Sequence, residues 1–316
     1  MTRVNARFLR RTFSSSKGNF LKMCALASLL CIFSQVPGLS QSHTSARTSS
    51  TSFILSRAVI EDIRLINSAS GFVYLQLVNK AYTNMTLSWI CNVERFSVLD
   101  KTVFIATDLV SFQTLSKWAP HVFLRERDQS PDLSYGQAAY YEMISFRSKI
   151  VEELLHSEVS VWLVESDSVW LADPLPHLQS VHGMDVVAGQ DGTFSDEIPE
   201  AGFIFLNATF RTKRLWSDLR QQHDQALAQM SEAADLGDAG SEMLMLPGHL
   251  GKVRWTFFPK INFVSGLWYT NEDMKALAKP VVIQNNWIVG NKAKTERAKK
   301  FGHWFLTEST TACVEK

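Results

Sequence analysis

Two carboxylates, Glu165 and Asp167, stand two residues apart directly after the short apolar run 159–164. This run is too short for a helix and rich in strand-forming residues, so it predicts a buried strand. Side chains at positions i and i+2 of an extended backbone point to one side, and the two carboxylates therefore converge where the strand ends. Paired hard oxygen ligands suit Mg²⁺ or Mn²⁺, which proteins often share with substrate phosphates. The alternative is a polar turn whose acids only face water.

The elements that must position this pair follow a regular order. Apolar patterns predict strands at residues 72–78, 98–106, 122–124 and 159–164, and helices at residues 81–96, 111–118 and 138–157. Strands alternating with helices indicate an α/β protein with a parallel, doubly wound sheet. Such sheets bind ligands outside the carboxyl ends of their strands, where the acidic pair is expected.

The rest of the chain extends this pattern. Strands are expected at residues 185–188, 200–206 and 253–259, with a helix at 211–230 between the last two. Residues 60–70 suggest a helix or irregular segment, and Pro174 and Pro176 are expected to end strand pairing after the acidic segment.

The length and net charge of the chain limit its domain organisation and the classes of function that it can have. A chain of 316 residues is long enough for one large α/β domain. Its formal net charge of +1 and dispersed basic residues argue against a nucleic-acid surface.

The amino terminus has the composition of a secretory signal. Basic residues within residues 1–19 precede an apolar stretch at 20–39, which predicts either a cleaved signal peptide or a retained signal anchor. A mitochondrial presequence also fits the acid-free start, although the apolar run is too continuous for an amphipathic helix. Residues 40–57 are rich in Ser and Thr and predict a flexible stem. The catalytic domain is then expected at 58–310, followed by a short tail at 311–316.

Two features fit a lumenal protein. The triplets beginning at Asn84 and Asn207 are candidate glycosylation sites. Cys91 and Cys313 lie outside the apolar stretch and would be able to pair in an oxidising compartment, although the sequence does not show that they come close enough.

The sequence Val-Trp-Leu-x-Asp-Pro-Leu-Pro at residues 169–176, following the acidic pair, resembles the metal-binding segment of the nucleotide-diphospho-sugar transferase family. This family includes plant-type α-xylosyl- and arabinosyltransferases with the GT-A fold. The resemblance covers residues 70–306 in matching order. It implies that Glu165 and Asp167 hold Mn²⁺ or Mg²⁺, although the family usually has Asp where this chain has Glu165.

The same resemblance assigns the nucleoside side of the site. It places Asn79 and Asp108, which follow the first two strands, at a uridine, and it places Lys149 ahead of the acidic pair as a basic residue. Each residue also has an ordinary structural explanation. Asn79 suits a turn, Asp108 suits a helix cap, and Lys149 suits an exposed helix face.

Residues beyond the acidic pair would contact the sugars. Glu200 and Gly202 lie in a segment that resembles the family's strand beside the donor sugar, with Glu200 in place of the usual Asn. Glu242 falls where the family has an acceptor-side helix and is a candidate catalytic carboxylate. An exposed helical glutamate is the commoner explanation for such a residue.

Residues 281–294 resemble the family's closing motif. Asn286, Gly290 and Lys294 match it, and Gln284 stands where the family usually has a metal-binding His. The resemblance implies that Gly290, Lys294 and also Lys292 approach the diphosphate and that Gln284 offers the metal a carbonyl oxygen. A strand followed by a basic helix at 292–300 explains the lysines equally well.

Together these residues predict a metal-dependent glycosyltransferase. The resemblance implies a retaining enzyme with a UDP-pentose or UDP-galactose donor and a glycan or glycoprotein acceptor. A single-pass type II Golgi membrane protein, or a secreted one if the signal is cleaved, is the expected location. One alternative is an inactive lumenal binding or scaffold protein of the same fold, because Glu165, Glu200 and Gln284 all depart from the family pattern. A phosphate-processing hydrolase would need further metal ligands, and His177 and His182 lie beyond a proline turn.

Overall fold

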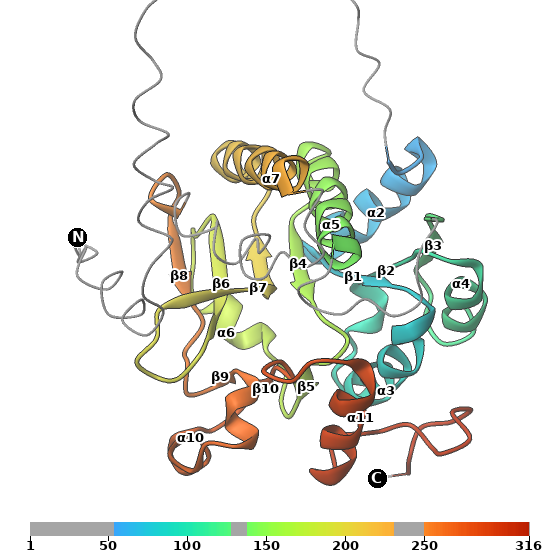
Figure 1. Cartoon of the computed structure of the whole chain (residues 1–316). Helices are drawn as coiled ribbons and strands as arrows, with labels where there is room; N and C mark the ends of the chain where they lie inside the picture. The colour runs from blue at the N-terminus through green and yellow to red at the C-terminus, as the bar shows by residue number, and fades with distance from the viewer. Residues whose placement is uncertain (1–53, 128–137, 231–249, 316) are drawn as a thin grey trace, which may run out of the picture. The chain divides into compact units, whose positions relative to one another are not determined.

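The computed structural model describes residues 54–127, 138–230 and 250–315 (Figure 1). The expected basic tail, the apolar stretch, most of the stem and Glu242 lie outside these residues. Within the described ranges, no helix is both long enough and apolar enough to span a membrane.

The core is a seven-stranded sheet that is mostly parallel, and the predicted α/β fold class is confirmed (Figure 1). In spatial order its strands are β3 (Val122–Leu124), β2 (Thr102–Ala106), β1 (Val73–Val78), β4 (Val161–Val164), β7 (Ile198–Leu206), β6 (Val186–Asp191) and β8 (Trp255–Phe257). Strand β7 runs antiparallel to both neighbours, β4 and β6, whereas the other pairings are parallel. The sheet is therefore mixed at β7.

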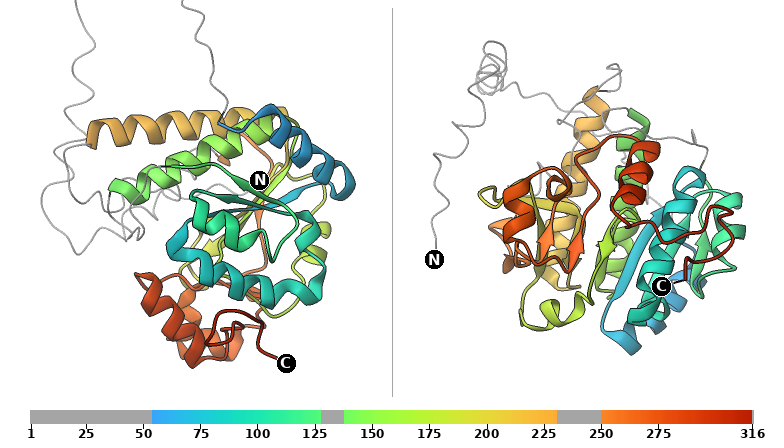
Figure 2. Two further views of the ribbon diagram at one scale, coloured as in Figure 1. Left: turned by 90° about the vertical axis from the view of Figure 1, so that its right-hand side faces the viewer. Right: turned by 90° about the horizontal axis from the view of Figure 1, so that it is seen from below.

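Helices cover both faces of this sheet (Figure 2). On one face, α2 (Arg57–Ser70), α5 (Ala138–His156) and α7 (Phe210–Met230) pack against inward-facing residues such as Leu75 and Leu163. On the other face, α3 (Thr83–Val93) and α4 (Leu109–Leu115) pack against Tyr74 and Trp162. Neighbouring strand residues enter opposite cores because side chains alternate along a strand.

A three-stranded sheet brings the end of the chain to the acidic segment. Its order is β5 (Val169–Trp170), β10 (Val282–Ile283) and β9 (Phe263–Val264), with β5 and β10 antiparallel. The helices α10 (Glu272–Leu277) and α11 (Asn291–Lys300) flank this region. Strand β5 and the short helix α6 (Leu175–Gln179), which Pro174 caps, were not expected from the sequence.

One expected strand begins later than its pattern suggests. Val98 precedes a 3₁₀ turn, Leu99–Lys101, and β2 begins only at Thr102. The Thr102 hydroxyl donates to the carbonyl of Val98 at 2.8 Å, which closes the turn at the start of β2.

A disulfide holds the carboxyl terminus on α3. Cys91 and Cys313 are bonded, with their Cα atoms 5.4 Å apart across a sequence separation of 222 residues. The residues expected to form a tail therefore pack on the domain, where Leu306 and Cys313 also form a β-bridge.

Candidate active site

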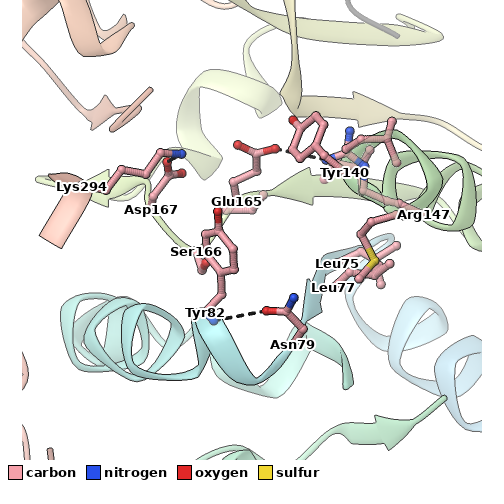
Figure 3. A pocket seen from close by; sticks show the side chains of 14 residues that line it. Leu75, Leu77, Asn79, Tyr82, Tyr140, Arg147, Glu165, Ser166, Asp167 and Lys294 are labelled. Carbon is pink, nitrogen blue, oxygen red and sulfur yellow. Dashed lines mark hydrogen bonds and ion pairs between the residues drawn. The ribbon is translucent and has the colours of Figure 1, made fainter. Parts of the chain in front are cut away.

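A pocket opens where β1 and β4 end, beneath the first half of α5 (Figure 3). Because these two strands are parallel, the residues that follow them meet at one edge of the sheet. The pocket is lined by Leu75, Leu77, Asn79, Tyr82, Tyr140, Met143, Ile144, Arg147, Leu163, Val164, Glu165, Ser166, Asp167 and Lys294. It therefore combines apolar side chains with acidic and basic groups.

Glu165 is fixed between a cation and a glycine. The guanidinium of Arg147 donates to Glu165 Oε1 at 3.1 Å. Pairing of Val164 with Phe203 sets Gly202 beside Glu165, and a Cβ on Gly202 would lie 2.4 Å from the carboxyl carbon. Only glycine leaves room for the carboxylate at this point.

Asp167 is bound by a lysine from α11. Lys294 Nζ lies 2.6 Å from Asp167 Oδ2, and the Asp167 side chain is only 3% exposed. Burial alone would lower the pKa of Lys294, but the nearby carboxylates of Asp167 and Glu165 raise it above its usual value. Asp167 Oδ1 is buried and has no partner among the described residues. This oxygen is available to a ligand.

The residues at this edge fit a hard divalent cation. Glu165 and Asp167 supply carboxylate oxygens, and Gln284 follows β10 at the position opposite the segment after Asp167. The Gln284 side chain is buried and its amide nitrogen has no partner among the described residues. Over the same residues, no group of three or more His, Cys, Asp or Glu side chains could hold a metal. An ion bound here would therefore draw its other ligands from amide, water or substrate oxygens, as Mg²⁺ commonly does.

The structure separates the two candidate nucleoside residues. Asn79 lines the pocket, and its side chain caps the 3₁₀ turn Lys80–Tyr82 by accepting from the Tyr82 amide. Asp108 instead accepts hydrogen bonds from the Lys80 amide at 2.6 Å and from Ser111 at the start of α4. Its carboxylate links the end of β1 to the first turn of α4 and so caps that helix. Asp108 does not line the pocket.

Arg147, rather than Lys149, brings the positive charge of α5 to the pocket. Lys149 pairs with Asp224 of α7 at 3.4 Å and does not line the pocket. Residues two apart on a helix point in different directions, so Arg147 lines the pocket and Lys149 does not. A role for Lys149 in nucleotide binding stays a prediction. Arg147 and Lys149 are both visible in the sequence as basic residues, but only the packing of α5 shows which of them faces the end of β4. Tyr82 and Tyr140 also line the pocket without having been proposed from the sequence.

The two lysines of the closing segment also differ in position, because one is in solvent and the other lines the pocket. Lys292 is 91% exposed and lies 3.9 Å from Glu296, whereas Lys294 reaches Asp167. Gly290 has a φ of 91° at the start of α11, which favours glycine there. Lys292 is therefore the solvated lysine of the basic helix and Lys294 the lysine of the site.

Asn286 and Glu200 hold neighbouring segments together. Asn286 Nδ2 donates to Glu200 Oε2 at 2.7 Å, and Asn286 Oδ1 accepts from the Gly266 amide. Glu200 Oε1 also accepts from the Gly202 amide at 3.0 Å. Burial, followed by repulsion from Asp191 and Glu165, raises the pKa of Glu200 well above its usual value. Neither residue lines the pocket itself.

The two candidate glycosylation sites differ in access. Asn84 is exposed on α3. Asn207 is half-buried, and its side chain accepts from Ser160 Oγ and donates to the Met184 carbonyl. A glycan on Asn207 would have to displace these bonds.

Residues 97–298 match the family model described as nucleotide-diphospho-sugar transferase. The match covers more than half of the 316 residues, so the chain belongs to the nucleotide-diphospho-sugar transferase family. The resemblance inferred from the motifs is thereby confirmed, and the class of protein is a glycosyltransferase that uses nucleotide sugars.

Named relatives span most of the chain at low identity. UDP-D-xylose:L-fucose alpha-1,3-D-xylosyltransferase 1 of Arabidopsis thaliana is 22% identical, with 93% of this chain and 88% of that protein covered. Beta-arabinofuranosyltransferase RAY1 of the same plant is 24% identical, with 79% of this chain and 50% of that protein covered. The glycosyltransferase GlyE of Streptococcus pneumoniae shares 14% identity and a TM-score of 0.47, with 72% of this chain and 60% of that chain covered.

Proposed function

We propose that this pocket binds the nucleoside diphosphate of a UDP-sugar and that the protein transfers the sugar, with retention, to a glycan or glycoprotein in the secretory pathway. The observation that carries the proposal is the pairing of each carboxylate with a buried or half-buried cation, Glu165 with Arg147 and Asp167 with Lys294, in one pocket. Such a set suits a diphosphate that binds together with a divalent cation. The carboxylates attract the metal ion, and the guanidinium and ammonium attract the phosphates.

Different residues of the site would bind the metal ion, the diphosphate and the nucleoside. Glu165 and Asp167, with Gln284 as a weaker third ligand, would hold Mn²⁺ or Mg²⁺, which would supply a Lewis acid for the phosphates. Lys294 and Arg147 would meet the negative charge that develops on the diphosphate as it leaves. Asn79 and Tyr82 border the part of the pocket where the nucleoside is expected.

Donor and location are proposed from the relatives and the amino terminus. Relatives in Arabidopsis thaliana are named for UDP-D-xylose, and one in Dictyostelium discoideum is named for UDP-galactose, so UDP-xylose and UDP-galactose are the first donors to test. The basic and apolar residues of 1–39 support a Golgi membrane protein with its catalytic domain in the lumen, or a secreted one.

Titration of the purified protein with UDP by calorimetry, with and without Mn²⁺, tests the proposal. We expect binding that depends on the metal and that Asp167→Asn weakens about tenfold or more, since one charged ligand is lost. Glu272→Gln is the control, because that carboxylate is 83% exposed on α10. Folded protein that binds no UDP under either condition would overturn the proposal.

A further inference from the structure

Trp287 is a large aromatic side chain that the fold leaves in solvent. It is 56% exposed and lies in the loop between β10 and α11 (Figure 1). Its backbone φ is 57°, a left-handed conformation that is unusual for a bulky residue. Packing in the core therefore does not account for a tryptophan at this position. Residues with such strained backbone conformations are often found at functional sites.

The indole is nevertheless held in one orientation. Its Nε1–H donates to Asp191 Oδ1 at 2.7 Å. Next to it, Asn286 is bonded to Glu200 and to the Gly266 amide, and Arg297 donates to Asn285 at 2.6 Å. An exposed ring that is oriented in advance loses little conformational entropy when a ligand stacks on it.

The loop is linked by side-chain contacts to Glu165, which lines the pocket. Asn286 contacts Glu200, which bonds to the Gly202 amide, and Gly202 lies against the Glu165 carboxylate. One short chain of contacts therefore connects Trp287 to the acidic pair. The exposed Val289, two residues further on, adds apolar surface to the same loop.

We propose that Trp287 is the platform on which the acceptor sugar stacks, and that the acceptor is a pyranoside with an open apolar C–H face. Aromatic rings bind such faces because they are apolar and flat, while the ring's N–H is used to fix its position. Asp191 is then a positioning residue that acts through the indole. This inference rests on the proposed function and specifies the acceptor side of the same site.

Saturation-transfer NMR tests the inference with methyl glycosides of xylose, galactose, glucose, mannose and L-fucose, all as pyranosides, in the presence of UDP and Mn²⁺. We expect at least one glycoside to bind the unmodified protein and Trp287→Ala to weaken that binding about tenfold. Trp287→Phe, which keeps a ring, should retain more of the affinity than Trp287→Leu. Phe210→Ala is the control, because Phe210 is 77% exposed on α7.

Calorimetry with UDP on the same samples separates the two proposals. If UDP binds but no glycoside does, or if Trp287→Ala binds glycosides as tightly as the unmodified protein, the acceptor platform is wrong and the donor site stands. If the unmodified protein binds no UDP, the proposed function fails and this inference fails with it. A loss of UDP binding in Trp287→Ala equal to its loss of glycoside binding would also overturn the inference, since it would indicate a general structural role.

Discussion

Lys294 Nζ lies 2.6 Å from Asp167 Oδ2 and joins two side chains that are 127 residues apart in the sequence. The lysine comes from α11, and the aspartate follows β4. The pairing of β5 with β10 brings these segments together, so the small second sheet places Lys294 beside Asp167 in the pocket. The Lys294 ammonium is half-buried, and we expect it to bind the phosphates of a nucleotide from this position.

Lys294→Gln should weaken UDP binding about ten- to a hundredfold, because a charged hydrogen bond to phosphate is lost. Lys292→Gln is the matched control on the same helix, since Lys292 is 91% exposed. Calorimetric titration of both variants checks this prediction, and equal effects of the two substitutions would contradict it.

Arg147→Gln should lower UDP affinity and turnover by a similar factor, because Arg147 is the cation of α5 that lines the pocket. Lys149→Gln should alter both by less than about twofold, because its ammonium faces Asp224. Initial rates with UDP-xylose and UDP-galactose, together with UDP titrations, make the comparison. A larger loss in Lys149→Gln would support the role in nucleotide binding that the sequence suggested for Lys149.

Gly202→Ala should displace the Glu165 carboxylate, because the new Cβ would lie 2.4 Å from its carboxyl carbon. We expect Mn²⁺-dependent UDP binding to fall about tenfold, while the free energy of unfolding changes by about 1 kcal/mol or less, since the flexible side chain can move. Gly251→Ala is the control, because a Cβ there meets no atom within 4 Å. Unchanged metal dependence in Gly202→Ala would argue against Glu165 as a ligand.

Asp185 should make the folded state sensitive to acid. Its burial opposes ionisation, but bonds from Arg211, the Arg254 amide and Thr209 outweigh this and lower its pKa from 3.8 to about 2. A carboxyl with a depressed pKa stabilises the folded state fully above its unfolded pKa near 4, and this contribution disappears as the pH falls towards 2.

The contribution is roughly 2 kcal/mol at neutral pH. Denaturant unfolding of the unmodified protein and of Asp185→Asn, measured from pH 7 to pH 2, should show a difference in stability that is constant above pH 5 and shrinks between pH 4 and pH 2. A difference that does not vary with pH would show that the Asp185 charge is not the cause.

Local patterns in the sequence were sufficient for much of the fold. Short continuous apolar runs rich in strand-forming residues marked β1, β4 and β7, and apolar residues at helical spacing marked α3 and α7, because each of these elements is buried against its neighbours. The two-residue strand β5 was not marked by any such pattern, since it owes its form to pairing with β10. The antiparallel direction of β7 likewise depends on how the chain returns to the sheet.

The sequence by itself determined the α/β class, the family and the acidic pair, because the alternation of apolar strand-forming runs with helical segments and a motif with fixed spacing are local properties of the chain. Only the tertiary structure decided that Arg147 and Lys294 enter the pocket while Lys149 and Lys292 do not. The physical reason is that cations two residues apart on a helix have nearly the same local sequence environment, and only packing against the sheet distinguishes the face that meets the site.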